Sequence, residues 1–468
     1  MQFMESRQCL QKPSNPFAEP KRCLNCSCRH IRTAHFVVSI LLSIHNGGSR
    51  LGSLRNKAGS SKVQVKPKNL VKVEMPSATQ EINVNETTGS LAMSVDSVIN
   101  LDRGDPKVYE KFWLENGAAA AVEIPGWQKI SYFSDLTNLC WFLEPDFAAE
   151  IRRLHRLVGN AVADHGRHIV VGTGSSQLFL ASLFALSTAP EVAVACNGRP
   201  VPVVSSAPYF SYYPAATDLL KSGLFRWEGD ACSFHAGSTP YIEVVCSPRN
   251  PDGSARTAIV KSCNGKLIHD LAYYWPQYTA ITGAMDEDIM LFTVSKCTGH
   301  AGTRLGWALV KDAEVARRMT KFIEVNTIGV SKDSQYRAVR ILKAVCDGYE
   351  LEGAGESAKL FHFGRKVMAR RWEKLREVLA ANKVFGLMEF KKLHCEFMGK
   401  ETLPLPAFAW LECGRDIEDC ESFLRQKHKV LTRGGKDFGA DGKHARVSML
   451  GRDEDFDMFI QRLKAIRL

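Results

Sequence analysis

The chain is 468 residues long, with 45% hydrophobic and 24% charged residues. This composition is typical of a globular protein and argues against a fibrous, membrane-embedded or wholly disordered one. The length suggests two or three domains with a large core. Of the net charge of +11, residues 1–98 carry +7, so the body lacks the concentrated basic surface of a nucleic-acid-binding protein, and we expect no nucleic-acid partner.

Residues 1–98 are predicted to form a disordered extension, because Lys, Ser, Asn and Pro recur in them and their one apolar stretch, residues 35–44, is too short to span a bilayer. Cys23, Cys26 and Cys28, followed by His30, could form half of a zinc site, but no second ligand pair follows, so we expect no metal. A signal anchor or a transit peptide is the alternative for this extension. We expect a cytoplasmic protein without a stable membrane span.

Ten of the 14 cysteines lie in the body, several of them inside apolar runs, such as Cys140, Cys196 and Cys246. Free cysteine is one of the most frequently buried residue types, and intracellular proteins keep their thiols reduced. The body cysteines are therefore expected to be reduced and buried.

From about residue 100 the pattern alternates between strands and helices. Several strand candidates are continuous apolar runs, which are typical of strands buried on both faces of a mainly parallel sheet. A helical pattern at residues 175–186 lies between two of them, so the predicted fold class is α/β. The predicted strands are residues 168–172, 201–205, 224–227, 241–246, 266–270, 288–294 and 304–310.

After about residue 312 the pattern changes to a second, smaller α+β domain, which residues 100–150 are expected to complete. Its predicted helices are residues 312–325, 332–345, 358–381 and 454–466, and its predicted strands are residues 407–411, 430–432 and 445–449. The predicted division is an extension at 1–98, the first part of the small domain at 99–150, a large cofactor-binding domain at 151–325 and the rest of the small domain at 326–468.

Four short segments carry candidate functional residues. The Gly/Ser turn at residues 172–177 follows a strand and opens a helix, where free N–H groups favour a phosphate, although many such turns bind nothing. Asn250 opens a segment that alone indicates only a β-turn. Asp270 ends a strand, a position where α/β enzymes place functional groups, and could instead cap a helix. Lys296 follows an apolar strand in Gly/Ser/Thr-rich surroundings, and Arg304 stands eight residues later.

The four segments together are more specific than each alone, because they supply the groups that pyridoxal 5'-phosphate (PLP) requires. PLP needs a lysine for its imine, a carboxylate facing the pyridine nitrogen and donors to its ring oxygen. It also needs cations and N–H groups around its phosphate. The sequence therefore predicts a PLP enzyme.

The body resembles the plant tryptophan aminotransferases and their alliinase relatives over nearly four-fifths of the chain. The segments that carry the resemblance are Asn-Leu-Asp-Arg-Gly-Asp-Pro (100–106), Ser-Tyr-Phe-Ser-Asp-Leu-Thr-Asn-Leu-Cys-Trp-Phe-Leu-Glu-Pro (131–145), Val-Val-Gly-Thr-Gly-Ser-Ser-Gln (170–177), Ser-Pro-Arg-Asn-Pro-Asp-Gly (247–253), His-Asp-Leu-Ala-Tyr-Tyr-Trp-Pro (269–276), Ser-Lys-Cys-Thr-Gly-His-Ala-Gly-Thr-Arg (295–304) and Arg-Val-Ser-Met-Leu (446–450).

The resemblance implies a fold-type I PLP-dependent transferase that forms a homodimer with shared active sites. Lys296 matches the Schiff-base lysine, Asp270 the carboxylate at the pyridine nitrogen, and Arg446 the arginine that binds the substrate's α-carboxylate. The remaining matches are Asn250 and Tyr273 at the ring hydroxyl, Ser175, Ser176, Thr293, Ser295 and Arg304 in the phosphate-binding segments, Tyr132 reaching the phosphate from the other subunit, and Tyr209 stacking on the cofactor.

The resemblance also implies a reaction, the transfer of the amino group of L-tryptophan to a 2-oxo acid such as pyruvate, which yields indole-3-pyruvate in auxin biosynthesis. The alternative is the C–S lyase reaction of alliinases on cysteine sulfoxides. Alliinases carry a cysteine-rich, EGF-like module at the N-terminus, and the four N-terminal cysteines here lack its spacing, which favours the aminotransferase. The residues themselves do not define the amino donor.

Overall fold

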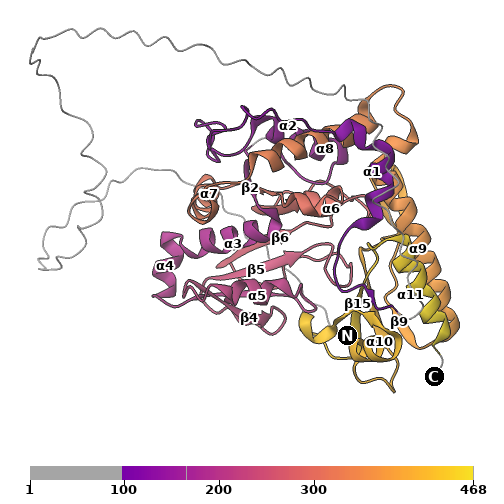
Figure 1. Ribbon diagram of the computed structural model, residues 1–468. Coiled ribbons are helices and arrows are strands. Elements are labelled where there is room, and N and C mark those ends of the chain that lie inside the picture. Colours follow the sequence, from indigo (N-terminus) through magenta and orange to yellow (C-terminus); the bar gives the residue numbers. More distant parts are fainter. Residues whose placement is uncertain (1–96, 165, 467–468) are drawn as a thin grey trace, which may run out of the picture. The chain divides into compact units, whose positions relative to one another are not determined.

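The computed structural model describes residues 97–164 and 166–466. In this part of the chain a seven-stranded sheet carries the functional motifs (Figure 1). The predictions for the extension, its cysteines and its apolar stretch fall almost wholly on residues outside this part. The strands, in their order across the sheet, are β2 (His168–Gly172), β8 (Gly306–Val310), β7 (Ile289–Thr293), β6 (Gly265–Asp270), β5 (Tyr241–Cys246), β3 (Val201–Ser205) and β4 (Phe225–Asp230).

The predicted mainly parallel sheet is confirmed, and one strand is reversed. Every neighbouring pair is parallel except those of β8, which runs antiparallel to β2 and to β7. All residues of β7 are buried, as its continuous apolar run predicts, and all residues of β5 are buried as well, including Glu243. Because β8 is reversed, its first residue lies at the edge where its neighbours end, and Gly306 pairs with both Gly172 and Thr293.

Helices cover the sheet and their ends follow local signals in the sequence. The α2 helix has Pro145 in its first turn and ends at Gly159 in the left-handed conformation, while the side chain of Asp312 caps the α7 helix. The α3 helix packs against α7 and against the sheet. The helices in this part of the chain are α1 (Glu110–Asn116), α2 (Pro145–Val158), α3 (Gly174–Ser187), α4 (Pro190–Cys196), α5 (Tyr212–Leu219), α6 (Val294–Cys297), α7 (Ala313–Thr327) and α8 (Lys332–Glu350), with short 3-10 turns η2 (Lys107–Tyr109), η3 (Gly117–Ala120) and η4 (Ala301–Thr303).

No single helix among the described residues is long and apolar enough to cross a membrane. Only α3 and α4 taken together, across a bend of 69°, reach the required length and composition.

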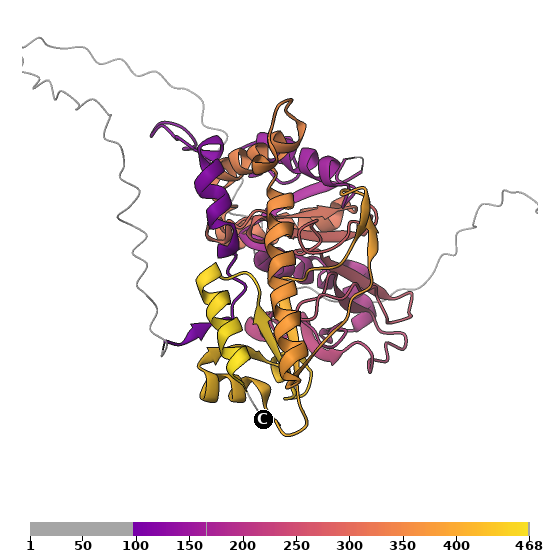
Figure 2. The same ribbon diagram turned by 90° about the vertical axis from the view of Figure 1, so that its right-hand side faces the viewer.

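A second, antiparallel sheet is formed by the C-terminal part of the chain. Its strand order is β14 (Arg433–Gly434), β15 (His444–Ser448), β12 (Phe408–Cys413) and β9 (Phe385–Leu387). The long helices α9 (Leu360–Asn382) and α11 (Asp453–Ala465) run side by side in both views (Figures 1 and 2). The remaining elements are α10 (Cys420–His428), η5 (Glu356–Ala358), η6 (Gly435–Phe438) and the pairs β1 (Ile99–Asn100) with β13 (Val430–Leu431) and β10 (Leu393–Cys395) with β11 (Lys400–Thr402).

The start of the described chain is therefore paired with its C-terminal part, since β1 runs parallel to β13. Thr87–Leu468 forms one compact unit, and its division into a large and a small domain stays a prediction.

The expectation that all body cysteines are reduced and buried is wrong in two respects. Cys413 and Cys420 form a disulfide, and Cys232 and Cys263 are exposed. Cys413 ends β12 and Cys420 begins α10, and the turn between them brings their Cα atoms to 5.6 Å, within the range that a disulfide requires. Both cysteines lie in a mainly polar stretch, residues 412–422, and not in an apolar run.

Candidate active site

The predicted site residues gather in one cavity of about 370 Å³ at the edge of the large sheet. The parallel strands β5, β6 and β7 all end at this edge, where open α/β sheets bind their ligands, and the reversed β8 begins there. Ten of the twelve predicted residues line the cavity, so five segments distant in the sequence form one site. They are Ser175, Ser176, Asn250, Asp270, Tyr273, Thr293, Ser295, Lys296, Arg304 and Arg446.

Lys296 is presented by the short α6 helix, directly after β7. Its ammonium group donates a hydrogen bond to the main-chain carbonyl of Gly104. A side chain at position 104 would not fit, because its Cβ would lie 2.7 Å from the ring of Phe408. Burial and the positive charge of Arg446 lower the pKa of Lys296 from 10.5 to about 8. The amine can therefore lose its proton near neutral pH.

Asp270 is the last residue of β6, and its carboxylate is buried at the base of the cavity. Tyr213 on α5 donates its phenol hydrogen to Asp270 Oδ2 at 2.8 Å, and the main-chain N–H of Ala272 donates to Oδ1 at 3.1 Å. Burial raises the pKa of Asp270, and the two hydrogen bonds oppose that rise. A cationic ring nitrogen beside this carboxylate would favour its ionised form.

A cluster of hydroxyl groups and one guanidinium lies where α3 begins. Ser175 and Ser176 are in the first turn of α3, and the side chain of Arg304 folds over that turn, since a Cβ on Gly174 would lie 2.6 Å from Arg304 Nη2. Thr293 Oγ1 is 3.1 Å from Ser295 Oγ. Free N–H groups at a helix start, hydroxyl groups and an arginine form an anion-binding site of the kind that holds a phosphate.

Arg446 and Asn250 lie together on the opposite wall. Arg446 is buried, and its Nη1 donates to Asn250 Oδ1 at 2.9 Å, which leaves the Asn250 amide nitrogen as a donor toward the cavity. Arg446 Nη2 donates to the carbonyl of Asp102, while Arg446 Nε is buried without a hydrogen-bond partner among the described residues. A buried guanidinium with an unused donor is suited to bind a carboxylate.

Tyr273 completes this wall. Its ring is buried edge-on to Phe408, with the ring centroids 5.6 Å apart. Burial raises the pKa of the Tyr273 phenol, so it stays protonated and serves as a hydrogen-bond donor.

Two predicted residues lie outside the cavity. Tyr132 is 67% exposed in the segment between η3 and α2. Tyr209 does not line the cavity, because its ring packs edge-on against Trp227 of β4, with the centroids 4.9 Å apart, and lies against Gly439. The next residue, Phe210, lines the cavity, and the stacking role expected of Tyr209 stays a prediction.

Sequence reasoning missed several lining residues. Arg103 and Gly104 belong to the 100–106 motif, and Phe408 to a predicted strand, so these positions carried a signal that was not used. Arg433 had no signal of its own. It faces the cavity because β14 pairs with β15, where Arg433 stands opposite Arg446.

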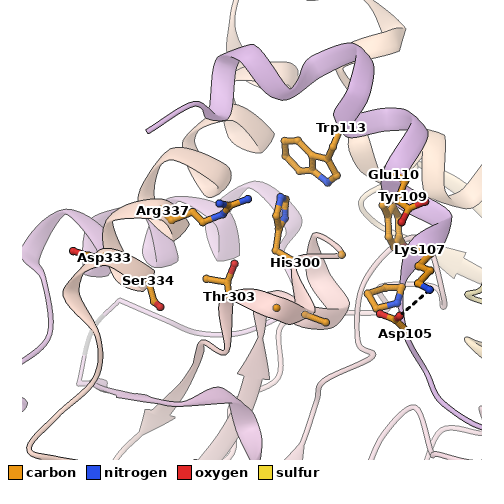
Figure 3. A pocket seen from close by; sticks show the side chains of 14 residues that line it. Asp105, Lys107, Tyr109, Glu110, Trp113, His300, Thr303, Asp333, Ser334 and Arg337 are labelled. Atoms are coloured by element: carbon orange, nitrogen blue, oxygen red, sulfur yellow. Dashed lines mark ion pairs between the residues drawn. The ribbon is translucent and has the colours of Figure 1, made fainter. Parts of the chain in front are cut away.

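A second cavity, of about 650 Å³, shares the lining residue Ala301 with the first. Figure 3 shows the side chains that line this second cavity. Trp113 donates its indole N–H to the Thr298 carbonyl at 2.8 Å, and its ring meets that of His300 edge-on at 4.6 Å. Burial and the charge of Arg337 lower the pKa of His300 to about 4, so its imidazole is neutral at physiological pH. The cavity thus has an aromatic, neutral wall next to the Lys296–Arg304 turn.

The family model described as Allinase matches residues 99–467. The chain belongs to this family. Tryptophan aminotransferase-related protein 2 of Oryza sativa subsp. japonica is 58% identical over 390 residues, 81% of this chain and 76% of the rice protein. The alliin lyase of Allium cepa var. aggregatum, over 77% of this chain and 80% of the lyase, is 34% identical.

The solved structure of an aminotransferase from Staphylococcus aureus matches with a TM-score of 0.55 at 19% identity, over 79% of this chain and 93% of that one. The Allinase-family chain therefore has the fold-type I aminotransferase fold that the motifs predict. Membership among the aminotransferases implies PLP as cofactor.

Proposed function

We propose that this protein is a PLP-dependent aminotransferase that converts L-tryptophan and a 2-oxo acid, pyruvate, into indole-3-pyruvate and the corresponding amino acid. The observation that carries the proposal is the meeting of Lys296, Asp270 and Arg446 in one cavity. The choice of tryptophan is supported by the rice relative's name and by its 58% identity, against 34% for the alliin lyase.

The cavity's donors suit each part of PLP. Ser175, Ser176 and Arg304 would hold the phosphate, where Gly174 leaves the space that a Cβ would fill. Asp270 would hold the protonated ring nitrogen, and among the described residues no ion pair competes for its carboxylate. Asn250 and Tyr273 would donate to the ring oxygen, and Lys296 would bind the cofactor covalently. When bound, PLP supplies an electron sink for the negative charge that develops at the substrate's Cα.

The protein's own groups divide the remaining tasks. Arg446 binds the α-carboxylate and so fixes the orientation of the amino acid. Lys296 Nζ would act as the base that takes the proton from the substrate's Cα and as the acid that later gives it back, because a pKa of about 8 lets the amine exchange its proton near neutral pH. Asp270 keeps the ring nitrogen protonated, because an anion within ~4–6 Å favours the charged form. The same groups then act in reverse on the 2-oxo acid.

We also propose a homodimer with shared active sites. Between η3 and α2, five large apolar side chains are each more than half exposed, namely Trp127, Ile130, Tyr132, Phe133 and Leu136. A contiguous exposed apolar segment of this kind marks a protein interaction site. The second cavity is lined by the neutral aromatic pair Trp113 and His300 and by charged residues such as Arg337 (Figure 3), and it lies next to the Lys296–Arg304 turn. We propose it as the path by which Tyr132 of a second copy would approach the phosphate site.

One assay tests the reaction. Purified protein is mixed with tryptophan and pyruvate, then separately with alliin, and the products are identified by mass spectrometry. We expect indole-3-pyruvate and alanine from the first mixture, and loss of this activity in Lys296→Ala. Formation of pyruvate from alliin without indole-3-pyruvate from tryptophan would replace the proposal with the C–S lyase, and normal turnover by Lys296→Ala would remove both.

A further inference from the structure

Two arginines face each other in the active-site cavity, although the α-carboxylate needs only one. Arg433 on β14 and Arg446 on β15 are directly opposite partners in an antiparallel pair, and both line the cavity. Like charges at such positions repel each other. The charge of Arg433 adds to burial in lowering the pKa of Arg446 to about 10. A second free cation here would also offer an incoming carboxylate a competing, wrongly placed partner.

Asp102 contacts both arginines in different ways. Its carboxylate accepts two hydrogen bonds from Arg433, from Nε at 2.7 Å and from Nη2 at 3.1 Å. Its main-chain carbonyl accepts from Arg446 Nη2. Asp102 thus neutralises one guanidinium with its side chain and orients the other with its backbone.

The backbone around Asp102 is held on both sides. The Leu101 N–H donates to the Leu431 carbonyl, and the Leu101 carbonyl accepts from the Ser448 N–H, each at 2.9 Å. Two residues after Asp102, the carbonyl of Gly104 accepts the hydrogen bond from Lys296. This segment therefore contacts both the lysine and the carboxylate-binding arginine.

We propose that Asp102 is a positioning residue for substrate recognition: by pairing with Arg433 and hydrogen-bonding Arg446, it makes Arg446 the single carboxylate receptor for both the amino acid and the 2-oxo acid. The inference rests on the proposed transamination and deepens it. If Asp102 had only a structural role, its loss would have little effect on catalysis. The Asp102–Arg433 pair is about a quarter exposed, and such pairs contribute on the order of 0–1 kcal/mol to the stability of the fold.

The test uses the holoenzyme and the variant Asp102→Asn, which keeps the backbone carbonyl and removes the charge. Because the unpaired Arg433 then binds the carboxylate in a second, unreactive orientation, we expect kcat and KM for both tryptophan and pyruvate to fall together about tenfold, corresponding to about 1.4 kcal/mol, with kcat/KM changed by less than about threefold. The dissociation constant of indole-3-propionate, an unreactive carboxylate measured by calorimetry, should fall by the same factor. That of indole-3-propionamide, which lacks the charge, should not change.

Two further variants separate this role from general damage. The matched control is Asp347→Asn, which removes a carboxylate of similar exposure from its pair with Arg153 between α2 and α8, away from the cavity. It should leave all four constants unchanged. The double variant Asp102→Asn/Arg433→Gln removes the competing cation as well, and should restore carboxylate affinity to within about threefold of wild type.

The inference is overturned if Asp102→Asn leaves the affinity for indole-3-propionate within about twofold, if the affinities for the carboxylate and the amide change equally, or if the double variant does not return the carboxylate affinity toward wild type. Failure of the proposed function looks different. In that case the wild-type protein itself does not turn over tryptophan, whatever the behaviour of the variants.

Discussion

Lys296 is partly buried beside two arginines, and this environment sets the pH at which its amine gives up its proton. Burial, Arg446 and Arg304 all disfavour the ammonium form, and only Asp105 opposes them, so the pKa falls from 10.5 to about 8. Below that pH the amine is protonated and cannot attack an aldehyde. Above it the neutral amine is the main form.

We therefore expect the rate at which the apoenzyme captures PLP to rise with pH and to level off above about pH 8, as followed by stopped-flow absorbance. Arg446→Met removes a neighbouring positive charge, which favours the ammonium form, so its midpoint should move to higher pH. A wild-type midpoint close to the ~10.4 of a free lysine would show that the cavity does not perturb the amine.

The residue scale also shows where sequence reasoning reached its limit. Asp270 and Lys296 could be singled out because each stands at the end of, or directly after, an apolar strand, whereas Arg446 was assigned from the family resemblance alone. Tyr209 and Phe210 follow β3 in a loop without periodicity, so the choice between the two rings depends on a backbone path that the sequence does not encode locally.

At the scale of elements, the start of α3 is the most constrained point of the site. Gly174 has φ of +74°, in the left-handed region, and its missing side chain makes room for Arg304. Gly174→Ala should strain the backbone and displace the guanidinium, so we expect the dissociation constant for PLP to rise about tenfold or more, measured by equilibrium dialysis.

The control for this variant is Gly159→Ala. Gly159 has a similar φ of +70° at the end of α2, but open space surrounds the position. It should lose a comparable amount of stability, on the order of 1 kcal/mol, yet bind PLP as wild type does. Equal losses of PLP affinity in both variants would attribute the effect to backbone strain and not to the Arg304 contact.

The strands were predictable because buried parallel strands consist mainly of apolar residues. The strands β2, β3 and β5 have the predicted bounds. The reversed direction of β8 was not predictable, because an apolar run looks the same whichever way the strand runs. That reversal matters for function, since it brings Arg304 to the edge where β7 presents Lys296. Similarly, the pairing of β14 with β15 is a long-range contact, and it alone places Arg433 opposite Arg446.

At the scale of the whole molecule, ten of the twelve predicted site residues line one cavity of a single chain, while Tyr132 is exposed and does not line it. If Tyr132 serves the phosphate site of a second copy, each active site combines Lys296 of one protomer with Tyr132 of the other. Such an arrangement can be tested by complementation, because a homodimer exchanges the same parts in both directions.

We expect Lys296→Ala to be inactive and Tyr132→Ala to bind PLP weakly, each as a homodimer. In a heterodimer formed by co-expression, one site receives both substitutions and is inactive, and the other receives neither. Random pairing makes half the dimers mixed, so the mixture should regain about a quarter of the wild-type activity per protomer.

The matched control replaces Tyr132→Ala with Ser176→Ala, which lies in the same cavity as Lys296. In the mixed dimer, Ser176→Ala lies in the site that keeps Lys296, because both residues belong to the same protomer. The other site lacks Lys296, so neither site is wild type. Recovery with Ser176→Ala, or none with Tyr132→Ala, would mean that the two sites are not shared through Tyr132.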